Sequence, residues 1–378
     1  MDRRWRFVVV IGKSGTYTHA FPGNRIGVLY GWGLNNSSQL AYSGSNFDAN
    51  PTPRRSQALT SMQNWSKVSC GNTFGLGLLS DGSLYAWGRN VEGQCGIPGS
   101  LTYTAPTQIG SDAWTTVAGG GQHSLAIKDD GTLWAWGRIG DGVLGISGLT
   151  TNQTTPALVS SDSWTSVAAS QYNSFAIKSD GTLWGWGINI DEYLMPQADQ
   201  TGAINQIGSA TWSKISASMS FGSYTGRHFA GIQSDGTLWT WGYNTDGRLG
   251  DGTQVDKLTP TQIGSDTWND VAARDGGCIA IKSDGTLWAW GNNSFGQVGD
   301  GTTTTRISPV LISSETWSSV AVCAAIKSDN TLWTWGYNLW GTVGDGTTQN
   351  ALSPVRVSHV EWEQVAASNI VSKVGLRK

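Results

Sequence analysis

The fold is decided by one stretch of sequence, Ser283-Asp284-Gly285-Thr286-Leu287-Trp288-Ala289-Trp290-Gly291. An Asp-Gly pair flanked by residues that favour extended backbone predicts a hairpin with a tight type I′ turn that leads into a strand. Trp288 and Trp290 are expected on one face of this strand, with Leu287 and Ala289 on the other. Because both faces are apolar, we expect the strand to lie in a sheet that is sandwiched between two similar sheets.

Copies of this stretch run along the whole chain at intervals of 45 to 55 residues. In the last copy Asn330 replaces the glycine, and asparagine is the next most tolerant residue at a positive φ. We number the repeat units first to seventh by their Trp-Gly pairs, which begin at Trp32, Trp87, Trp136, Trp186, Trp241, Trp290 and Trp335.

One unit is predicted to hold four short antiparallel strands, as at 267–273, 278–283, 286–292 and 308–312. Repeats of this length built from four strands are typical of propeller blades. Gly, Thr, Ser and Trp dominate the units and no 3.6-residue period appears, which excludes helical repeats. The sequence therefore predicts an all-β fold, a seven-bladed β-propeller.

Two further stretches carry a family resemblance. Residues 117–137 read Val-Ala-Gly-Gly-Gly-Gln-His-Ser-Leu-Ala-Ile-Lys-Asp-Asp-Gly-Thr-Leu-Trp-Ala-Trp-Gly, and residues 293–301 read Asn-Ser-Phe-Gly-Gln-Val-Gly-Asp-Gly. Both resemble the repeat of the regulator-of-chromosome-condensation family, and the resemblance extends from about residue 26 to 376. It implies a seven-bladed propeller with four-stranded blades, but it does not fix the function, since one scaffold hosts many unrelated roles.

The composition limits the partners of the 378-residue chain. Charged residues make up 13%, the net charge is −3 and the sequence pI is about 5.8. A nucleic-acid partner is not expected, because the basic face that it needs is missing. Membrane insertion is not expected either, since no apolar run is long enough to span a bilayer. The few apolar residues in 1–12 are too short a run for a secretory signal.

The repeat also predicts the domain organisation. Residues 26–378 are expected to form one propeller domain, preceded by an irregular arm at 1–25. A ring of blades avoids open sheet edges when its two termini share a blade. We expect the segment that starts at Trp362 to supply the inner strand of that blade, with 26–33 beside it.

No cofactor, metal ion or catalytic group is expected. Cys70, Cys95, Cys278 and Cys323 share no metal-ligand spacing and are interpreted as small buried fillers, with a disulfide or a zinc site as alternatives. The Gly-Asp-Gly-Thr segments at 250–253, 299–302 and 344–347 bring one carboxylate each, so they are interpreted as turns rather than calcium loops. Lys13-Ser14 lacks the earlier glycine of a phosphate loop. The histidines have no nucleophile or acid at a catalytic spacing, and the protein is predicted not to be an enzyme.

Two neighbouring units depart from the repeat. Residues 188–196 replace the usual loop after the fourth Trp-Gly pair, and 219–228 lengthen the next turn by seven residues. Strand alternation places both on one face of the ring. Aromatic, Met and Arg side chains are favoured at binding hot spots, so the partner-binding residues are predicted to be Tyr193, Met195, Phe221, Tyr224, Arg227 and His228. A neutral loop insertion is the alternative, and a third departure, at 95–103, lies on the same face.

The sequence therefore favours a non-enzymatic scaffold that binds a protein partner. The compact repeats resemble those of bacteria and tailed bacteriophages, which favours a virion component (tail, fibre or capsid-associated) or a bacterial surface protein. Its partners would be other virion proteins, or a host surface receptor or glycan. The virion is the expected location, after assembly in the host cytoplasm, with cytoplasm or cell surface as alternatives.

Two other functions follow from the family resemblance. The first is a regulator of a small GTPase like a guanine-nucleotide exchange factor, although the basic tail suited to chromatin is missing. The second is a role like that of a plant ultraviolet photoreceptor. That role is disfavoured because Gly226-Arg227-His228 lacks the Trp and Thr that flank it in the photoreceptor motif.

Overall fold

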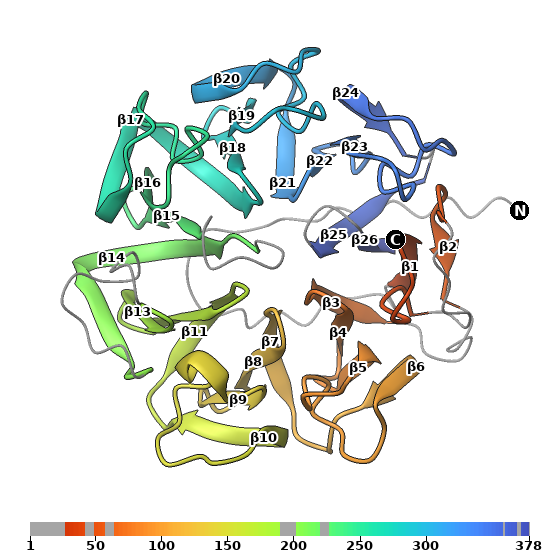
Figure 1. The fold of residues 1–378 in the computed structure, drawn as a ribbon, viewed down its shortest axis with the longest axis vertical. Coiled ribbons are helices and arrows are strands. Elements are labelled where there is room, and N and C mark those ends of the chain that lie inside the picture. Colours follow the sequence, from red (N-terminus) through yellow and green to blue (C-terminus); the bar gives the residue numbers. More distant parts are fainter. Residues whose placement is uncertain are drawn as a thin grey trace, which may run out of the picture.

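The computed structural model describes residues 27–41, 49–56, 64–189, 202–219, 227–357, 360–368 and 372–377. These residues form β-strands joined by turns, with one 3-10 turn among them, η1 (Gly140–Gly142). The sheets stand around a common axis like the spokes of a wheel (Figure 1). The predicted all-β architecture of antiparallel four-stranded sheets is confirmed.

Each unit runs outward from the axis through four strands, which we call A to D. The inner A strands are β3 (Trp65–Cys70), β7 (Trp114–Gly119), β11 (Trp164–Ala169), β21 (Trp317–Ala321) and β25 (Trp362–Ser368). The B strands are β4 (Phe74–Leu79), β8 (His123–Lys128), β12 (Asn173–Lys178), β15 (His228–Gln233), β18 (Gly277–Lys282), β22 (Ala324–Lys327) and β26 (Ser372–Arg377).

The C strands carry the Trp-Gly pairs. They are β1 (Val28–Gly33), β5 (Leu84–Arg89), β9 (Leu133–Gly137), β13 (Thr182–Gly187), β16 (Thr237–Gly242), β19 (Leu287–Gly291) and β23 (Leu332–Gly336). The outer D strands are β2 (Arg54–Arg55), β6 (Thr102–Gln108), β10 (Gln153–Ser160), β20 (Arg306–Ser313) and β24 (Ala351–Arg356).

Two long strands join repeat units that are counted as separate in the sequence. β14 (Asn205–Ala217) and β17 (Lys257–Arg274) each serve as strand D of one unit and strand A of the next, so the fourth, fifth and sixth units form one ten-stranded sheet. Gly208 and Gly264 lie inside these strands with φ of 63° and 62°, where a side chain would be strained. In these two strands the connection from strand D to the next strand A therefore bends at a glycine, while the residues on either side stay extended.

The turn of the defining stretch differs from the expected type I′. Only Gly285 of the Asp-Gly pair has a positive φ, 89°. Gly285 N donates to Lys282 O at 2.9 Å, and Lys282 N donates to Thr286 O at 3.0 Å. This is a three-residue hairpin loop, in which a type I turn is followed by a glycine bulge. Asn330 takes the same place with φ 66°, as expected.

The polar residues of the stretch form a chain of hydrogen bonds. Asp284 Oδ1 accepts from Thr286 N at 2.9 Å and from Thr286 Oγ1 at 2.6 Å. The same hydroxyl accepts from Trp288 Nε1 at 2.8 Å. Lys282 Nζ lies 3.9 Å from the centre of a Trp288 ring and 2.7 Å from Asp266 Oδ2. These bonds explain why Asp-Gly-Thr-Leu-Trp recurs: the aspartate orients the threonine, and the threonine orients the indole of the tryptophan.

The two apolar faces of the C strand pack against different neighbours, as the sequence predicts. Trp290 packs towards Ile232 and Leu238 of the fifth unit. Leu287 and Ala289 instead pack towards the seventh unit. Trp290, Leu287 and Ala289 are fully buried. The core is therefore a series of apolar layers between successive sheets rather than a single centre.

One hydrogen bond recurs between neighbouring sheets. Trp290 Nε1 donates across the junction to Arg248 O at 3.1 Å, and Arg248 lies in the loop between strands C and D of the preceding unit. We call this bond the tryptophan clamp. It recurs from Trp32 to Thr342 O (3.0 Å), Trp87 to Gln39 O (3.0 Å), Trp136 to Gln94 O (2.9 Å), Trp186 to Val143 O (2.9 Å) and Trp335 to Gln297 O (2.9 Å).

A second donor shares the clamp carbonyl in most units. Ser124 Oγ donates to Gln94 O at 2.8 Å, and Ser174 Oγ donates to Val143 O at 2.7 Å. Cys278 in β18 and Cys323, directly before β22, stand at the equivalent position, with Sγ 3.7 and 3.9 Å from the clamp carbonyl. All four cysteines are buried and free of disulfides. Burial raises the pKa of the Cys278 thiol to about 12, so it stays protonated.

Both ends of the described chain lie in one sheet, of order β2-β1-β26-β25. β25 is the inner strand, as predicted. However, β1 does not lie beside it, because β26 intervenes and pairs with both. β26 was not predicted from the sequence, since Ser372–Arg377 lacks the Asp-Gly turn and Trp of the other units. Gln364 of β25 joins this sheet to the next, accepting from Val68 N at 2.9 Å and donating to Val68 O at 3.1 Å.

Deleting 362–378 is expected to lower the melting temperature of the whole protein. The deletion removes β25 and β26, which exposes the buried Trp32 and Leu29 and ends the Gln364 contact. Thermal unfolding followed by circular dichroism measures the effect. Deletion of 1–15 is the control and should change the curve little. An unchanged melting curve after the C-terminal deletion would contradict the role of this sheet.

Candidate functional site

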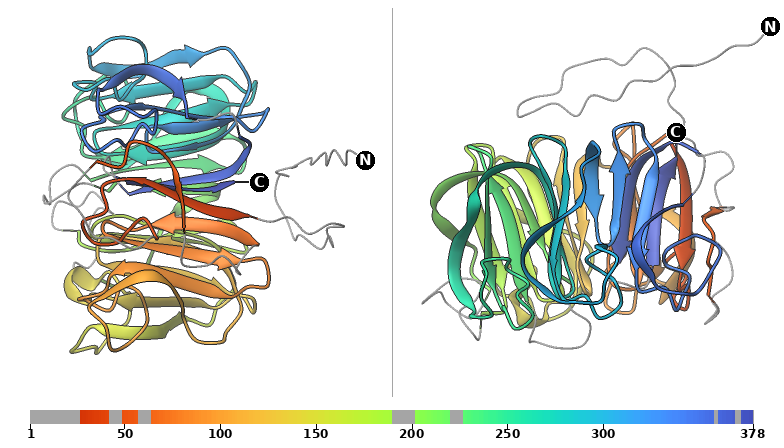
Figure 2. Two further views of the ribbon diagram at one scale, coloured as in Figure 1. Left: turned by 90° about the vertical axis from the view of Figure 1, so that its right-hand side faces the viewer. Right: turned by 90° about the horizontal axis from the view of Figure 1, so that it is seen from above.

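The two faces of the ring differ in regularity. Every A–B turn and every C–D loop ends on one face, which we call the loop face, because successive strands are antiparallel. The repeated Ser-Asp-Gly turns lie on the opposite face, where β26 also ends (Figure 2). The uniform face repeats one solution, whereas the loop face varies from unit to unit. Variation on a rigid scaffold is where binding residues are usually found.

The regular C–D loops are each organised by one buried asparagine. Asn293 Nδ2 donates to Asp300 Oδ1 at 3.1 Å and to Thr302 O at 2.9 Å, while its Oδ1 accepts from Val298 N at 2.8 Å. Asn244 and Asn338 make the same set of bonds in their own loops. The aspartate of Gly-Asp-Gly-Thr is thus part of the turn, as expected from the sequence. The described residues contain no cluster of three metal-ligating side chains.

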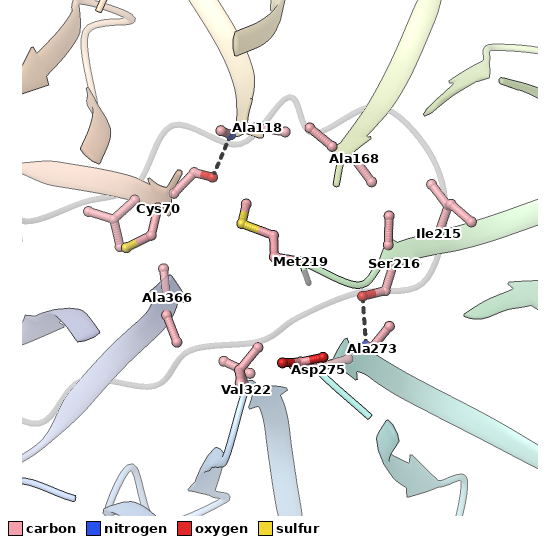
Figure 3. Close-up of a pocket in the computed structure, with 18 residues that line it drawn as sticks. Cys70, Ala118, Ala168, Ile215, Ser216, Met219, Ala273, Asp275, Val322 and Ala366 are labelled. Atoms are coloured by element: carbon pink, nitrogen blue, oxygen red, sulfur yellow. Dashed lines mark hydrogen bonds between the residues drawn. The ribbon is translucent and has the colours of Figure 1, made fainter. Parts of the chain in front are cut away.

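A cavity of about 210 Å³ lies on the axis, between the inner strands (Figure 3). Small side chains such as Ala118, Ala168 and Ala366 line it, with Met219 and Asp275 from A–B turns. Ser216 Oγ, which points to its wall, accepts from Ala273 N at 2.9 Å. Among the described residues that line the cavity, Asp275 is the one carboxylate, and none of them is His, Lys or Arg. This part of the lining is mainly apolar.

The histidines of the A–B turns bridge neighbouring units. His123 Nε2 lies 2.9 Å from Ser174 Oγ, and His228 Nε2 lies 3.0 Å from Gly277 O. Both imidazoles are buried. Burial, together with the charge of nearby Arg138, lowers the pKa of His123 to about 3, so its ring is neutral at pH 7. Both histidines therefore form hydrogen bonds between units inside the fold.

The predicted partner-binding residues divide into two groups. Tyr193, Met195, Phe221 and Tyr224 lie outside the described residues. Arg227 and His228 are described and are 2% and 0% exposed. Arg227 Nη1 donates to Ile188 O at 3.2 Å, across the junction of the fourth and fifth units. The prediction that these two side chains contact a partner is therefore corrected, because they form bonds inside the fold.

The described residues of the junction between the fourth and fifth units form no tryptophan clamp. Trp241 Nε1 is buried and has no acceptor among them, and the C–D loop of the fourth unit, at 190–201, lies outside the described residues. Phe229 stands opposite Trp241, where four other units place Ser or Cys, so its side chain offers no second donor. Its ring lies 5.6 Å from that of Trp241 and 4.7 Å from that of Phe175. The sequence does show Phe229 at a position where Ser or Cys recurs, and this departure from the repeat was not used in the prediction of the site.

Radial antiparallel sheets around an apolar axis, with a variable loop face, define a propeller-type protein with a surface suited to binding. A model of the "Regulator of chromosome condensation (RCC1) repeat" matches the chain at 27–78, 81–127, 130–177, 235–281, 284–325 and 329–370. A second model of that description matches at 65–94, 114–142, 164–191 and 270–297. The chain belongs to the RCC1 repeat family. The first model leaves out 178–234, which contains both irregular segments.

Solved structures support the same fold. Human WBSCR16 superposes with a TM-score of 0.81 at 19% identity, over 94% of this chain and 99% of that one. Prp20p from Saccharomyces cerevisiae superposes with a TM-score of 0.82 at 18% identity, over 94% and 92% of the two chains. Among curated proteins, the Rho GTPase-activating protein gacGG of Dictyostelium discoideum is 34% identical over 77 residues. That match covers 20% of this chain and only 6% of the relative.

Two substitutions compare the exceptional junction with a regular one. Trp290→Phe removes a clamp donor and leaves the carbonyl of Arg248 without this hydrogen bond. It should lower the free energy of unfolding by about 1 kcal/mol or more, since the lost bond and the unsatisfied carbonyl both contribute. Trp241→Phe removes a buried donor that has no acceptor among the described residues, so it should cost clearly less or even stabilise. Urea unfolding gives both values. Equal losses would show that the Trp241 N–H is satisfied in solution.

The pH dependence of stability reports on His123. Its folded-state pKa is about 3 and its unfolded value about 6.5. Between these values the unfolded chain binds the extra proton, so this contribution to stability is complete above pH 6.5 and declines as pH falls. We expect the melting temperature of His123→Gln to fall less steeply from pH 7 to pH 5 than that of the parent. Parallel curves would contradict the burial of a neutral imidazole.

Proposed function

We propose that this protein is a non-enzymatic, closed seven-bladed propeller that binds a protein partner through its loop face. Residues 26–378 would form the single propeller domain, and residues 1–25 an arm outside it. Support comes from a framework whose polar side chains are used for turns and clamps, and from a loop face that varies from unit to unit on this framework. No described helix is long and apolar enough to cross a lipid bilayer.

The observation that carries this proposal is the exception at the fourth–fifth junction. The C-strand tryptophans of six units donate to a loop carbonyl of the preceding unit, whereas Trp241 has no acceptor among the described residues. The irregular segments, 188–196 and 219–228, belong to these two units. The regular units show what the scaffold requires, and these two neighbouring units depart from it. We therefore propose that the partner contacts Tyr193, Met195, Phe221 and Tyr224, with Arg227 and His228 supporting their segment from inside.

Regulation of a small GTPase is the second candidate. The structure of Prp20p is described together with its binding to Gsp1p and histones, and another structure holds yeast RCC1 (Prp20) bound to Kap60. These partners are proteins, which fits the proposed use of the loop face. A virion role was also expected from the sequence. None of the relatives named above is a virion protein, and virion, cytoplasm and cell surface stay predictions.

Exchanging the irregular segments tests the proposal. Residues 190–196 and 220–226 are replaced by the C–D loop and A–B turn of the sixth unit, and Arg227 and His228 are kept. We expect a melting temperature within a few degrees of the parent and loss of the proteins that the parent captures from an extract of its source cells. Exchange of the regular fifth-unit loop at 244–256 for the same sixth-unit loop is the matched control.

Two outcomes decide between the candidates. A segment-exchanged protein that captures the same proteins as the parent would move the binding site elsewhere. Release of fluorescent GDP from Gsp1p, accelerated by the parent and not by the exchanged protein, would favour the GTPase regulator.

A further inference from the structure

The C–D loops of the fifth, sixth and seventh units share the motif Gly-Asp-Gly-Thr. In the sixth unit Asp300 Oδ1 accepts from Thr302 N at 3.0 Å, from Thr302 Oγ1 at 2.8 Å and from Asn293 Nδ2 at 3.1 Å. In the sixth unit the loop thus uses Oδ1 alone. In the fifth and seventh units Oδ2 also accepts from the threonine hydroxyl, at 2.8 Å in Asp251 and at 3.1 Å in Asp345. Oδ2 can still accept from a further partner, because an ionised carboxylate has about four acceptor sites.

In two of the three loops a cation of the chain itself binds that second oxygen. Arg306 Nε donates to Asp300 Oδ2 at 2.7 Å, and its Nη2 lies at 2.7 Å from the same atom. Lys257 Nζ lies 3.2 Å from Asp251 Oδ2. Each cation stands six residues after its aspartate and pairs across the sheet with the glycine of the Trp-Gly pair. The loop and its cation therefore form the same arrangement in the fifth and sixth units.

The seventh unit keeps the loop and lacks the cation. Asp345 Oδ1 accepts from Thr347 N and Thr347 Oγ1, both at 2.9 Å. The residue that pairs with Gly336, where Lys257 and Arg306 stand in the other units, is Ala351. Asp345 is half-buried and forms no ion pair with any residue in the described ranges. A carboxylate shaped to receive a cation is thus left with an open place beside it.

Exposed apolar side chains lie in the same loop and strand and in the preceding loop. Leu352 follows Ala351 directly and is 37% exposed, and Leu339 of the same loop is 53% exposed. Phe295, from the preceding loop, is 42% exposed and packs edge-on against Tyr337 with ring centroids 5.2 Å apart. The backbone of Gly296 approaches Leu352 so closely that a Cβ there would lie 2.6 Å from Leu352 Cδ2. The two loops therefore form one surface.

We propose that this surface binds a segment of a partner protein that carries an arginine or lysine flanked by aliphatic side chains. The cation would take the place on Asp345 Oδ2 that Arg306 takes on Asp300, and the aliphatic groups would cover Leu339 and Leu352. Charge complementarity selects this occupant, since the chain shows twice that the carboxylate binds such a cation. Arginine fits best, because its planar group can donate two hydrogen bonds.

This inference rests on the proposed function in one respect, because it assigns a partner to the same loop face. It uses the sixth and seventh units, however, and none of the residues of the irregular segments. Failure of the segment exchange and failure of the Asp345 site are therefore distinguishable.

The test uses the full chain and a peptide copied from its own sixth unit. The peptide acetyl-Thr-Arg-Ile-Ser-amide reproduces residues 305–308 and is titrated while the amide signals of Thr347 and Asn338 are followed by NMR. We expect saturable shifts in the parent and binding weaker by about tenfold or more in Asp345→Asn, as for loss of a charge-assisted hydrogen bond. Ala351→Arg fills the place from within and should abolish binding, with the fold intact. Arg306→Ala should open a second site at Asp300, seen at Thr302.

Four outcomes would overturn the proposal. The first is the absence of saturable shifts in the parent. The second is equal binding by Ala351→Arg. The third is equal binding of a peptide with citrulline in place of arginine, which would show apolar capture without a charge. The fourth is binding only after deletion of 1–26, which would assign the place to the chain's own arginine-rich arm.

Discussion

The structure depends on the contact between one sheet and the next, and the tryptophan clamp fixes that contact. An indole buries a large apolar area and also has one N–H that must find an acceptor. The acceptor is a carbonyl in a loop of the preceding unit, as for Trp290 and Arg248 O. One side chain therefore sets both the spacing of two sheets and the position of a loop. Where Ser174 or Lys373 also binds the clamp carbonyl, the loop is held from two sides.

Most of the framework could be predicted because it is repeated. Position-by-position comparison of the copies gave the strands, the two apolar faces and the inner strand that starts at Trp362. The turn type could not be predicted, since Asp-Gly suits both a type I′ turn and a type I turn with a glycine bulge. β26 was missed because Ser372–Arg377 has the strand pattern without the markers. The bend at Gly264 was not predicted, because the residues between strands D and A have no strand pattern and were expected to form a loop.

The candidate site was less accessible from sequence for a physical reason. Composition predicts exposure only on average, and Arg227 has a guanidinium that can bond a carbonyl inside the fold as well as a partner outside it. Absences are also hard to see in a sequence. Among the described residues Trp241 has no acceptor and Asp345 has no cation, and both absences become visible only when the equivalent atoms in the other units are compared. In a repeat protein each regular unit thus serves as a reference for the exceptional ones.

The pairing of the two chain ends in one sheet has a mechanical consequence. Val28, at the start of β1, pairs with Arg377, at the end of β26. The chain therefore enters β1 and leaves β26 at the same end of these two paired strands. A force that pulls the ends apart acts across these strands, and it loads their hydrogen bonds one after another, like a zipper. Strands pulled lengthwise would resist with all bonds at once. Under tension the ring would therefore open first between β1 and β26, at low force, while the remaining sheets stay packed.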